Sequence, residues 1–147
     1  MRNKNNYAVL LVGGSGTRFW PMSRKHKPKQ FLDITGRGTL FEQTLFRIKP
    51  MFKSENIFVV TNFNYKKDVL PLIKKYKIPI SNILLEPEPK NTAPAVCWAA
   101  AKINKINKDA VMIVLPSDHL ISDNKNFLIV LNNAVALAQD NHLMTLG

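Results

Sequence analysis

Residues 7–18 read YAVLLVGGSGTR, an apolar run that ends in a glycine-rich turn. The six apolar residues Tyr7 to Val12 are typical of a strand buried on both faces of a parallel sheet. The glycines that follow let the backbone turn sharply and approach a ligand closely. This segment therefore predicts a buried strand that delivers a loop to a binding site.

Strand patterns recur along the chain. β-Branched and aromatic residues predict further strands at Ile57 to Thr61 and Ile83 to Leu85. Val111 to Leu115 has the pattern of a central strand, and His142 to Leu146 predicts the beginning of one more.

Helical patterns lie between these strands. Thr39 and Glu42 have capping-box spacing, before a helix of apolar periodicity that ends near Pro50. The other predicted helices are Tyr65 to Tyr76, with Pro71 as a kink or break, a helix capped by Asn91 or Thr92 that continues to Ile106 with Pro94 in its first turn, and Asn124 to Gln139, capped by Ser122 or Asp123.

Alternating strands and helices of this length predict an α/β fold. They imply βαβ units, a mostly parallel sheet and helices on both faces. No repeat, linker or domain boundary interrupts the pattern, so residues 1–147 are expected to form one domain or part of one. The last predicted strand stops at the end of the sequence, and the sheet is therefore expected to be incomplete at its C-terminal side.

Composition narrows the function classes. The net charge of +11 favours an anionic partner, but lysines such as Lys66, Lys67 and Lys74 are scattered as on solvated helix faces. Recognisable nucleic-acid-binding motifs and interleaved aromatics are missing, which argues against a nucleic-acid partner. No apolar run approaches the roughly 20 residues of a membrane span. A single cysteine and the lack of a signal-peptide pattern predict a soluble protein of the cytoplasm.

The glycine-rich turn has the composition of a phosphate cradle. In Gly13-Gly14-Ser15-Gly16-Thr17-Arg18, missing side chains leave backbone N–H groups able to reach phosphate oxygens. Arg18 lies inside the turn and Lys29 follows it, which supplies two cations. A dinucleotide-binding fingerprint would need glycine at Phe19, and a P-loop would need Gly-Lys-Ser/Thr, so neither of these motifs fits.

A carboxylate follows the strand that ends at Leu115. Asp118, in Leu115-Pro116-Ser117-Asp118-His119, could bind Mg²⁺ on a nucleotide through an oxygen ligand. Ligands bind beyond the carboxyl ends of such strands, where the glycine-rich turn is also expected. Because no second His or Cys stands at ligand spacing, His119 is interpreted as structural or as a support for Asp118.

A second carboxylate, Glu86, follows the strand that ends at Leu85. Guanine presents two adjacent donors, N1–H and N2–H, which a carboxylate accepts well and a neutral amide matches poorly. Glu86 could therefore recognise guanine. Equally, Glu86 and Glu88 could simply complement the dipole of the helix that follows. Cys97, Trp98, Phe127, Leu128 and Leu131 have helical spacing and are predicted to belong to the core.

At the level of motifs, the sequence resembles the mannose-1-phosphate guanylyltransferases, also called GDP-mannose pyrophosphorylases, of the sugar nucleotidyltransferase family. The resemblance rests on residues 11–24, LVGGSGTRFWPMSR, on residues 28–31, PKQF, and on the motifs NTAPA at 91–95 and LPSDH at 115–119. Departures are small: Val12 replaces a usual Ala, Phe19 and Met22 replace Leu, and Lys90 replaces Arg. The resemblance spans the whole chain and implies a Rossmann-like nucleotidyltransferase fold of the GT-A type.

This resemblance implies a reaction in which mannose 1-phosphate attacks the α-phosphorus of GTP, giving GDP-mannose and pyrophosphate with Mg²⁺ as cofactor. It implies catalytic roles for Arg18, Lys29 and Asp118, with Asp118 as the metal ligand. Arg18 would hold the leaving phosphates and Lys29 would neutralise charge near the α-phosphate. Nucleotide binding is expected at Leu11, Gly13, Gly14, Ser15, Gly16, Thr17, Arg18, Lys29, Glu86, Asn91, Thr92 and Ser117.

Several alternatives stay open. A thymidylyl-, uridylyl- or adenylyltransferase acting on glucose 1-phosphate would be expected to carry Gln at Glu86, and a catalytically silent nucleotide-binding paralogue would share most of these motifs. Because the family continues beyond Gly147, residues 1–147 are expected to be the N-terminal part of one nucleotidyltransferase domain, inactive alone. A homo-oligomer of the full-length protein stays open.

Overall fold

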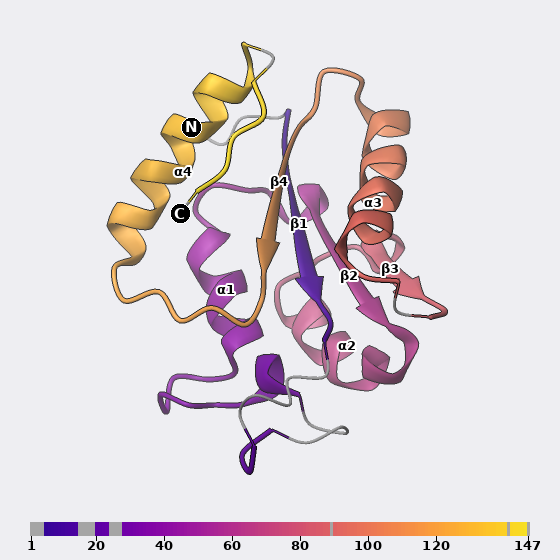
Figure 1. Ribbon diagram of the computed structural model, residues 1–147, viewed down its shortest axis with the longest axis vertical. Helices are drawn as coiled ribbons and strands as arrows, with labels where there is room; N and C mark the ends of the chain where they lie inside the picture. Colours follow the sequence, from indigo (N-terminus) through magenta and orange to yellow (C-terminus); the bar gives the residue numbers. More distant parts are fainter. Residues whose placement is uncertain (1–4, 15–19, 24–27, 89, 141, 147) are drawn as a thin grey trace.

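We describe the fold from a computed structural model, in which residues 5–14, 20–23, 28–88, 90–140 and 142–146 are described. Strands and helices alternate along these residues (Figure 1). The strands are β1 (Asn6–Val12), β2 (Ile57–Asn62), β3 (Ile83–Glu86) and β4 (Val111–Pro116). The helices are α1 (Leu40–Ile48), α2 (Lys66–Lys75), α3 (Thr92–Ile106) and α4 (Asn124–Ala138). The predicted α/β alternation is confirmed.

The four strands form one parallel sheet in the order β3-β2-β1-β4. β1 lies between β2 and β4, with Leu10 opposite Val59 on one side and Leu115 on the other. Because every neighbouring pair is parallel, all four strands end at the same edge, the lower end of the sheet in Figure 1. This carboxyl edge is where ligands bind in open α/β sheets.

Helices cover both faces of the sheet, as predicted. On one face, α1, α2 and α4 pack side chains such as Leu45, Ile73 and Leu131 against alternate residues of the strands. On the other face, α3 packs Ala99 and Ile103 against the remaining strand residues. Side chains alternate between the two sides of a strand, so the almost continuous apolar run of β1 supplies both cores.

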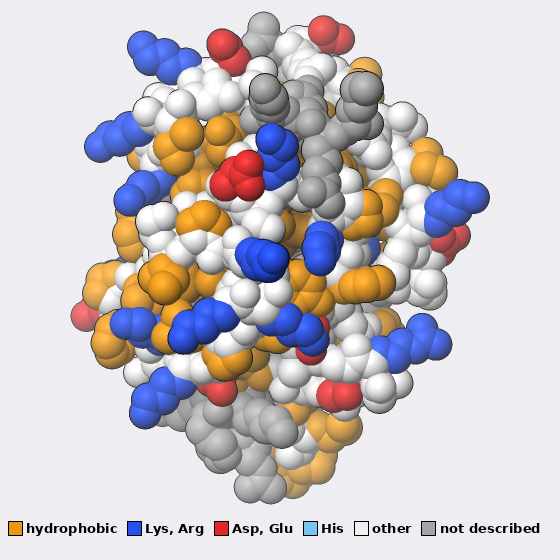
Figure 2. Space-filling view, turned by 180° about the vertical axis from the view of Figure 1, so that it is seen from behind, with side chains coloured by type: hydrophobic (Ala, Val, Ile, Leu, Met, Phe, Trp, Pro, Cys, Tyr) orange, Lys and Arg blue, Asp and Glu red, His pale blue; other side chains and the backbone are white. Residues whose placement is uncertain are grey.

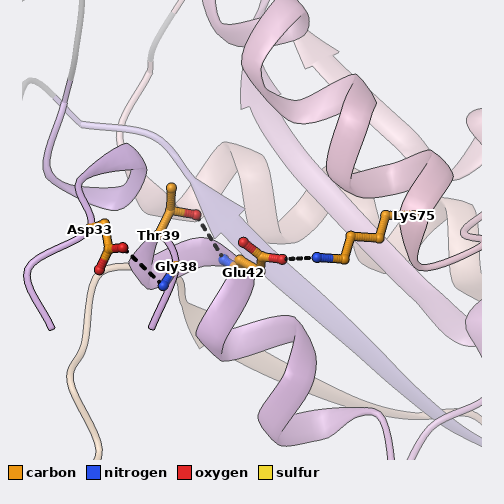
Figure 3. Close-up of polar contacts among 5 residues, drawn as sticks. All are labelled: Asp33, Gly38, Thr39, Glu42 and Lys75. Carbon is orange, nitrogen blue, oxygen red and sulfur yellow. Dashed lines mark hydrogen bonds and ion pairs between the residues drawn. The ribbon is translucent and has the colours of Figure 1, made fainter. Parts of the chain in front are cut away.

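The start of α1 is fixed by several polar contacts (Figure 3). Thr39 accepts a hydrogen bond at Oγ1 from the Glu42 N–H, which confirms the predicted N-cap. The Glu42 carboxylate forms an ion pair with Lys75 of α2 and thereby links the two helices. Before the cap, Asp33 Oδ2 accepts from the Gly38 N–H at 3.1 Å, which closes the loop that leads into α1.

At two helices the structure distinguishes between alternatives that the sequence left open. α2 continues through Pro71 as one helix of ten residues and begins one residue after a 3₁₀ turn at Phe63–Tyr65, so Pro71 does not break it. At α4 the cap is Asp123, whose side chain accepts from the Asn126 N–H at 2.9 Å. The aspartate, rather than Ser122, fills the N-cap position.

The end of the chain also differs from prediction. β4 is an edge strand of the described sheet, not a central one. Residues 142–146 were expected to begin a strand but have no regular secondary structure, and Leu143 is fully exposed. No described backbone hydrogen bond joins this segment to β4. A strand needs a neighbour to satisfy its backbone groups, which an apolar sequence by itself does not provide.

The surface lysines are distributed as the sequence predicts. Lys67, Lys74 and Lys77 are exposed, and Figure 2 shows lysine and arginine side chains spread over the face rather than gathered into a stripe. No described helix combines the length and the apolar character that a membrane span requires.

Candidate functional site

The carboxyl edge brings three of the predicted site segments together. Gly13 follows β1, Ser117 follows β4, and Glu86 is the last residue of β3. The strand order places the β1 loop next to the end of β4, and it places Glu86 two strands from β1. At about 4.8 Å between neighbouring strands, this is a separation of about 10 Å. One elongated ligand could therefore reach from the β1 loop to Glu86.

Lys29 and Asp118 meet at this edge. Lys29 lies on a 3₁₀ turn, Lys29–Phe31, and its Nζ is 4.0 Å from Oδ2 of Asp118. The two side chains are 24% and 41% exposed, so both the cation and the carboxylate remain accessible to a ligand. His119 Nε2 lies 3.7 Å from the other oxygen of Asp118, which agrees with its interpretation as a support for that carboxylate.

The turn that carries Lys29 is anchored in the core by Phe31. The Phe31 ring lies 6.3 Å from Phe41 in an edge-on arrangement and 5.7 Å from the ring of Tyr65, measured between centroids. Tyr65 follows β2 and Asp118 follows β4, so the turn lies across the end of β1 between them. Such an anchor holds Lys29 in place before any ligand arrives.

Gln30 lies between Lys29 and Phe31 on this turn and was not predicted as a site residue from the sequence. It is only 2% exposed, and its Nε2 has no hydrogen-bond acceptor among the described residues. Buried donors without a partner are rare in folded proteins. The signal that could have identified it was its position between Lys29 and Phe31 in a motif already singled out.

Two hydroxyl groups hold the end of β1. Thr61 Oγ1 donates to the Val12 carbonyl at 2.7 Å, and Ser117 Oγ donates to the Leu11 carbonyl at 2.8 Å. The Ser117 N–H donates to the same Leu11 oxygen at 3.2 Å. Ser117 is 2% exposed and Thr61 is fully buried, so both hydroxyls act here as internal supports. Their combined effect is to fix the backbone where the glycine loop begins.

The glycine loop is open where it is described. Gly13 and Gly14 are exposed, and a Cβ built on either would meet no described atom within 4 Å. Gly14 has a φ of +105°, a backbone conformation that residues with a side chain rarely adopt. The backbone is thus bare and accessible, as a phosphate cradle requires. Ser15, Gly16, Thr17 and Arg18 lie outside the described residues, and so do Arg24 to Lys27.

Glu86 lines a pocket of about 390 Å³ together with Pro87, Glu88, Lys90, Pro94 and Trp98. Burial raises the pKa of Glu86 above its ordinary value. Glu88 and Lys90 are highly exposed and pair with each other at 3.1 Å. Glu86 is therefore the partly desolvated carboxylate of this pocket.

Trp98 was predicted to belong to the core, and this prediction is wrong. Its side chain is 38% exposed and contributes to the wall of the Glu86 pocket. Cys97 is also exposed. Leu131 is buried, and Phe127 and Leu128 pack against the core, so the prediction holds for α4. The buried face of α3 consists of smaller residues, Ala95, Ala99 and Ile103.

The N-terminus of α3 opens at the same edge as Glu86. The helix begins at Thr92, and Asn91 occupies the N-cap position with φ 66°. Asn91 was predicted as a possible capping residue, but its side chain makes no capping hydrogen bond. The first N–H groups of a helix favour an anionic or polar acceptor. Asn91 and Thr92 are both exposed and accessible.

Among the described residues, no three His, Cys, Asp or Glu side chains are grouped as a metal site. Mg²⁺ in nucleotide sites is commonly held by one or two carboxylates together with substrate phosphates and water. The accessible Asp118 fits this type of site, in which the nucleotide completes the coordination.

Comparisons with known proteins agree with this geometry. A family model described as nucleotidyl transferase matches residues 7–147. The alginate biosynthesis protein AlgA of Pseudomonas putida is 46% identical over 131 residues, which cover 88% of this chain and 26% of AlgA. The mannose-1-phosphate guanylyltransferase of Escherichia coli is 36% identical and is matched over 100% of this chain and 31% of its own length. The chain spans about a quarter to a third of these relatives.

Solved structures show the same fold. A mannose-1-phosphate geranyltransferase from Thermus thermophilus has a TM-score of 0.79 at 30% identity, covering 91% of this chain and 38% of its own. A putative glucose-1-phosphate thymidylyltransferase from Bacillus anthracis has a TM-score of 0.63 at 18% identity, and the match covers 88% of this chain and 51% of the Bacillus chain. The predicted Rossmann-like architecture is confirmed by these similarities.

Proposed function

Because the chain belongs to the nucleotidyl transferase family, we propose that it binds GTP at the carboxyl edge of its sheet and forms part of a site that transfers GMP to mannose 1-phosphate. The products are GDP-mannose and pyrophosphate. The relatives named above as a mannose-1-phosphate guanylyltransferase and as AlgA, at 36% and 46% identity, support this choice of reaction.

The observation that carries the proposal is the meeting of Lys29 and Asp118 beside the bare glycine backbone. Their 4.0 Å approach joins a cation on the Lys29–Phe31 turn to a carboxylate that follows β4. A nucleoside triphosphate needs both kinds of group, since its phosphates are bound by cations and N–H donors and its metal ion by an oxygen ligand.

In the proposed reaction, a phosphate oxygen of mannose 1-phosphate forms a bond to the α-phosphorus of GTP. The bond from that phosphorus to the bridging oxygen of the β-phosphate breaks, and pyrophosphate leaves with the electron pair. The attacking oxygen is already ionised, so no general base is needed. Catalysis then depends on position and charge: Lys29 neutralises the α-phosphate, and the loop N–H groups and Arg18 hold the leaving phosphates.

Asp118 would hold Mg²⁺ together with phosphate oxygens of the nucleotide. When bound, the ion supplies charge neutralisation at the phosphates and fixes their orientation. The same carboxylate lies 4.0 Å from the Lys29 ammonium, so one cation and one metal ligand would face the same phosphates.

Glu86 would select the base. Its carboxylate can accept from the N1–H and N2–H of guanine, whereas adenine, uracil and thymine lack this pair of adjacent donors on one edge. Its partial burial strengthens such a contact, because a desolvated acceptor gains more from a donor than a hydrated one. Leu11, Asn91, Thr92 and Ser117 stay predictions as nucleotide contacts, and for Ser117 the contact would have to coexist with its bond to Leu11.

The reaction can be tested by measuring pyrophosphate release with GTP, Mg²⁺ and mannose 1-phosphate in a full-length protein that contains this chain. We expect release that requires the sugar phosphate, with GDP-mannose as the co-product. Release from GTP that proceeds equally without any sugar phosphate would contradict the proposal. So would a strong preference for glucose 1-phosphate with dTTP or UTP.

A further inference from the structure

We propose that the indole ring of Trp98 stacks on the guanine base of the bound nucleotide, in the pocket that Trp98 shares with Glu86. This inference rests on the proposed function and adds a binding residue that the motifs do not include. The ring would contact the face of the base while Glu86 contacts its edge.

The position of Trp98 on α3 supports this role. Trp98 follows Pro94 by four residues, so both lie on the same face of the helix, and both line the pocket. That face is distinct from the one formed by Ala95 and Ala99, which pack against the sheet. The largest side chain of α3 is therefore directed to the pocket and not to the core.

The pocket has the composition of a site for a flat apolar group with a polar edge. Pro87, Pro94 and Trp98 give it apolar walls, and Glu86 gives it an acceptor. Its volume of about 390 Å³ lies within the range of roughly 300–1,000 Å³ for small-molecule sites. Apolar walls with few polar groups are the usual arrangement in such sites, since the polar groups fix the orientation of the ligand.

The charges around the pocket favour a role for Glu86 toward a ligand. The ion pair at 3.1 Å between Glu88 and Lys90 occupies the other two charged side chains with each other. Among the described residues no ion pair to Glu86 is formed. Guanine would supply donors to this carboxylate and a π-face to the indole at the same time. Every base has a π-face, so Trp98 contributes affinity and Glu86 contributes selectivity.

Trp98 can be observed directly by fluorescence, because the chain has only two tryptophans, Trp20 and Trp98. In the Trp20→Phe variant, Trp98 is the only tryptophan, so tryptophan emission reports on it alone. We expect titration with GTP and Mg²⁺ to quench its emission, with a midpoint equal to the Kd from calorimetry on the same sample. Free N-acetyltryptophanamide titrated in parallel corrects for absorption by the nucleotide.

Affinity gives a second readout. Alanine substitutions of base-stacking aromatics correspond to roughly 5- to 140-fold losses in affinity, and we expect Trp98→Ala to weaken GTP binding within this range. Trp98→Phe should retain most of the affinity. The matched control is Phe46→Ala, since Phe46 is an aromatic on the opposite face of the sheet and is 67% exposed. It should leave binding unchanged, and the melting temperature of Trp98→Ala should stay close to that of the parent chain.

The two hypotheses fail differently. If GTP binds by calorimetry but Trp98 emission does not change and Trp98→Ala binds as tightly as the parent, the stacking inference is overturned and the proposed function stands. If the chain with both tryptophans shows no GTP binding in calorimetry, the proposed function fails, and the stacking inference fails with it.

Discussion

The Nζ of Lys29 lies 4.0 Å from Oδ2 of Asp118, so a turn that follows the glycine loop contacts the residue that follows β4. The strand order makes this contact possible, because β4 pairs directly with β1. A cation and a carboxylate far apart in the sequence are thereby brought to the same end of the sheet. This contact gives the first two predictions.

Lys29→Ala is expected to lower turnover of a full-length protein that contains this chain by about 10²- to 10³-fold, or about 2.7–4 kcal/mol, if Lys29 acts like other preorganised charge stabilisers. Nucleotide affinity should fall less than turnover. Steady-state rates of pyrophosphate release measure this effect. Lys53→Ala is the control, since Lys53 pairs with Glu55 at 3.8 Å on a turn before β2, at the other edge of the sheet. Equal losses in both variants would argue against a specific role for Lys29.

Asp118→Asn is expected to raise the Mg²⁺ concentration needed for half-maximal activity, because an amide oxygen carries no full charge for the ion. The Mg²⁺ dependence of the rate at saturating GTP measures this shift. Asp109→Asn, in the turn before β4, provides the control with the same chemical change. An unchanged Mg²⁺ requirement in Asp118→Asn would show that the metal is held elsewhere.

Glu86 predicts a pH dependence of base recognition. Because burial raises its pKa, Glu86 takes up a proton at a higher pH than an ordinary glutamate. A protonated carboxyl accepts poorly from two adjacent donors, so GTP affinity should fall as the pH is lowered through this raised value. GTP affinity should be measured at each pH for both the parent chain and Glu86→Gln, because the ratio of the two affinities cancels the titration of the nucleotide itself. We expect this ratio to approach one as the pH is lowered. A ratio that stays constant from neutral pH to about 4.3 would contradict the assignment.

Thr61→Val should destabilise the fold by about 1–3 kcal/mol, since it removes the donor of a buried 2.7 Å hydrogen bond to Val12 while keeping the shape of the side chain. The free energy of unfolding in urea measures this loss. We also expect weaker GTP binding, because the hydroxyl fixes the strand end from which the glycine loop starts. Unchanged unfolding and unchanged binding would mean that the loop is held without this bond.

Much of the fold could be predicted from sequence, because the capping residues and the apolar patterns of single segments agree with the parallel sheet that these segments form together. The apolar run of β1, the Thr39 cap and the Asp123 cap each indicate the element that forms there. The predicted strand at His142 to Leu146 was wrong because its formation depends on a neighbouring strand, and β4 offers it no described pairing. Periodicity also cannot tell which side of a helix faces a sheet when several faces are apolar. For this reason Trp98 was assigned to the core although it lines a pocket.

The candidate site could be predicted in part. The placement of Asp118 at the same edge as the glycine loop follows from the rule that ligands bind at the carboxyl edge, whereas the contact of Asp118 with Lys29 was not predicted. The contact between Ser117 and Leu11 was not predicted, since it depends on the exact register between β1 and β4. The burial of the Gln30 amide was missed for a different reason: its place in the motif was visible in the sequence, but its burial depends on how the turn packs.

The central claim is that residues at the carboxyl edge of this sheet bind GTP and select it by its base. The most direct test is isothermal titration of the 147-residue chain with GTP, ATP, UTP and dTTP in the presence of Mg²⁺. We predict that GTP binds at least about tenfold more tightly than each of the others, since a carboxylate that meets the wrong base leaves polar groups unpaired. Glu86→Gln should reduce this preference without abolishing binding. Equal affinity for all four nucleotides, or tighter binding of dTTP or UTP, would contradict the account.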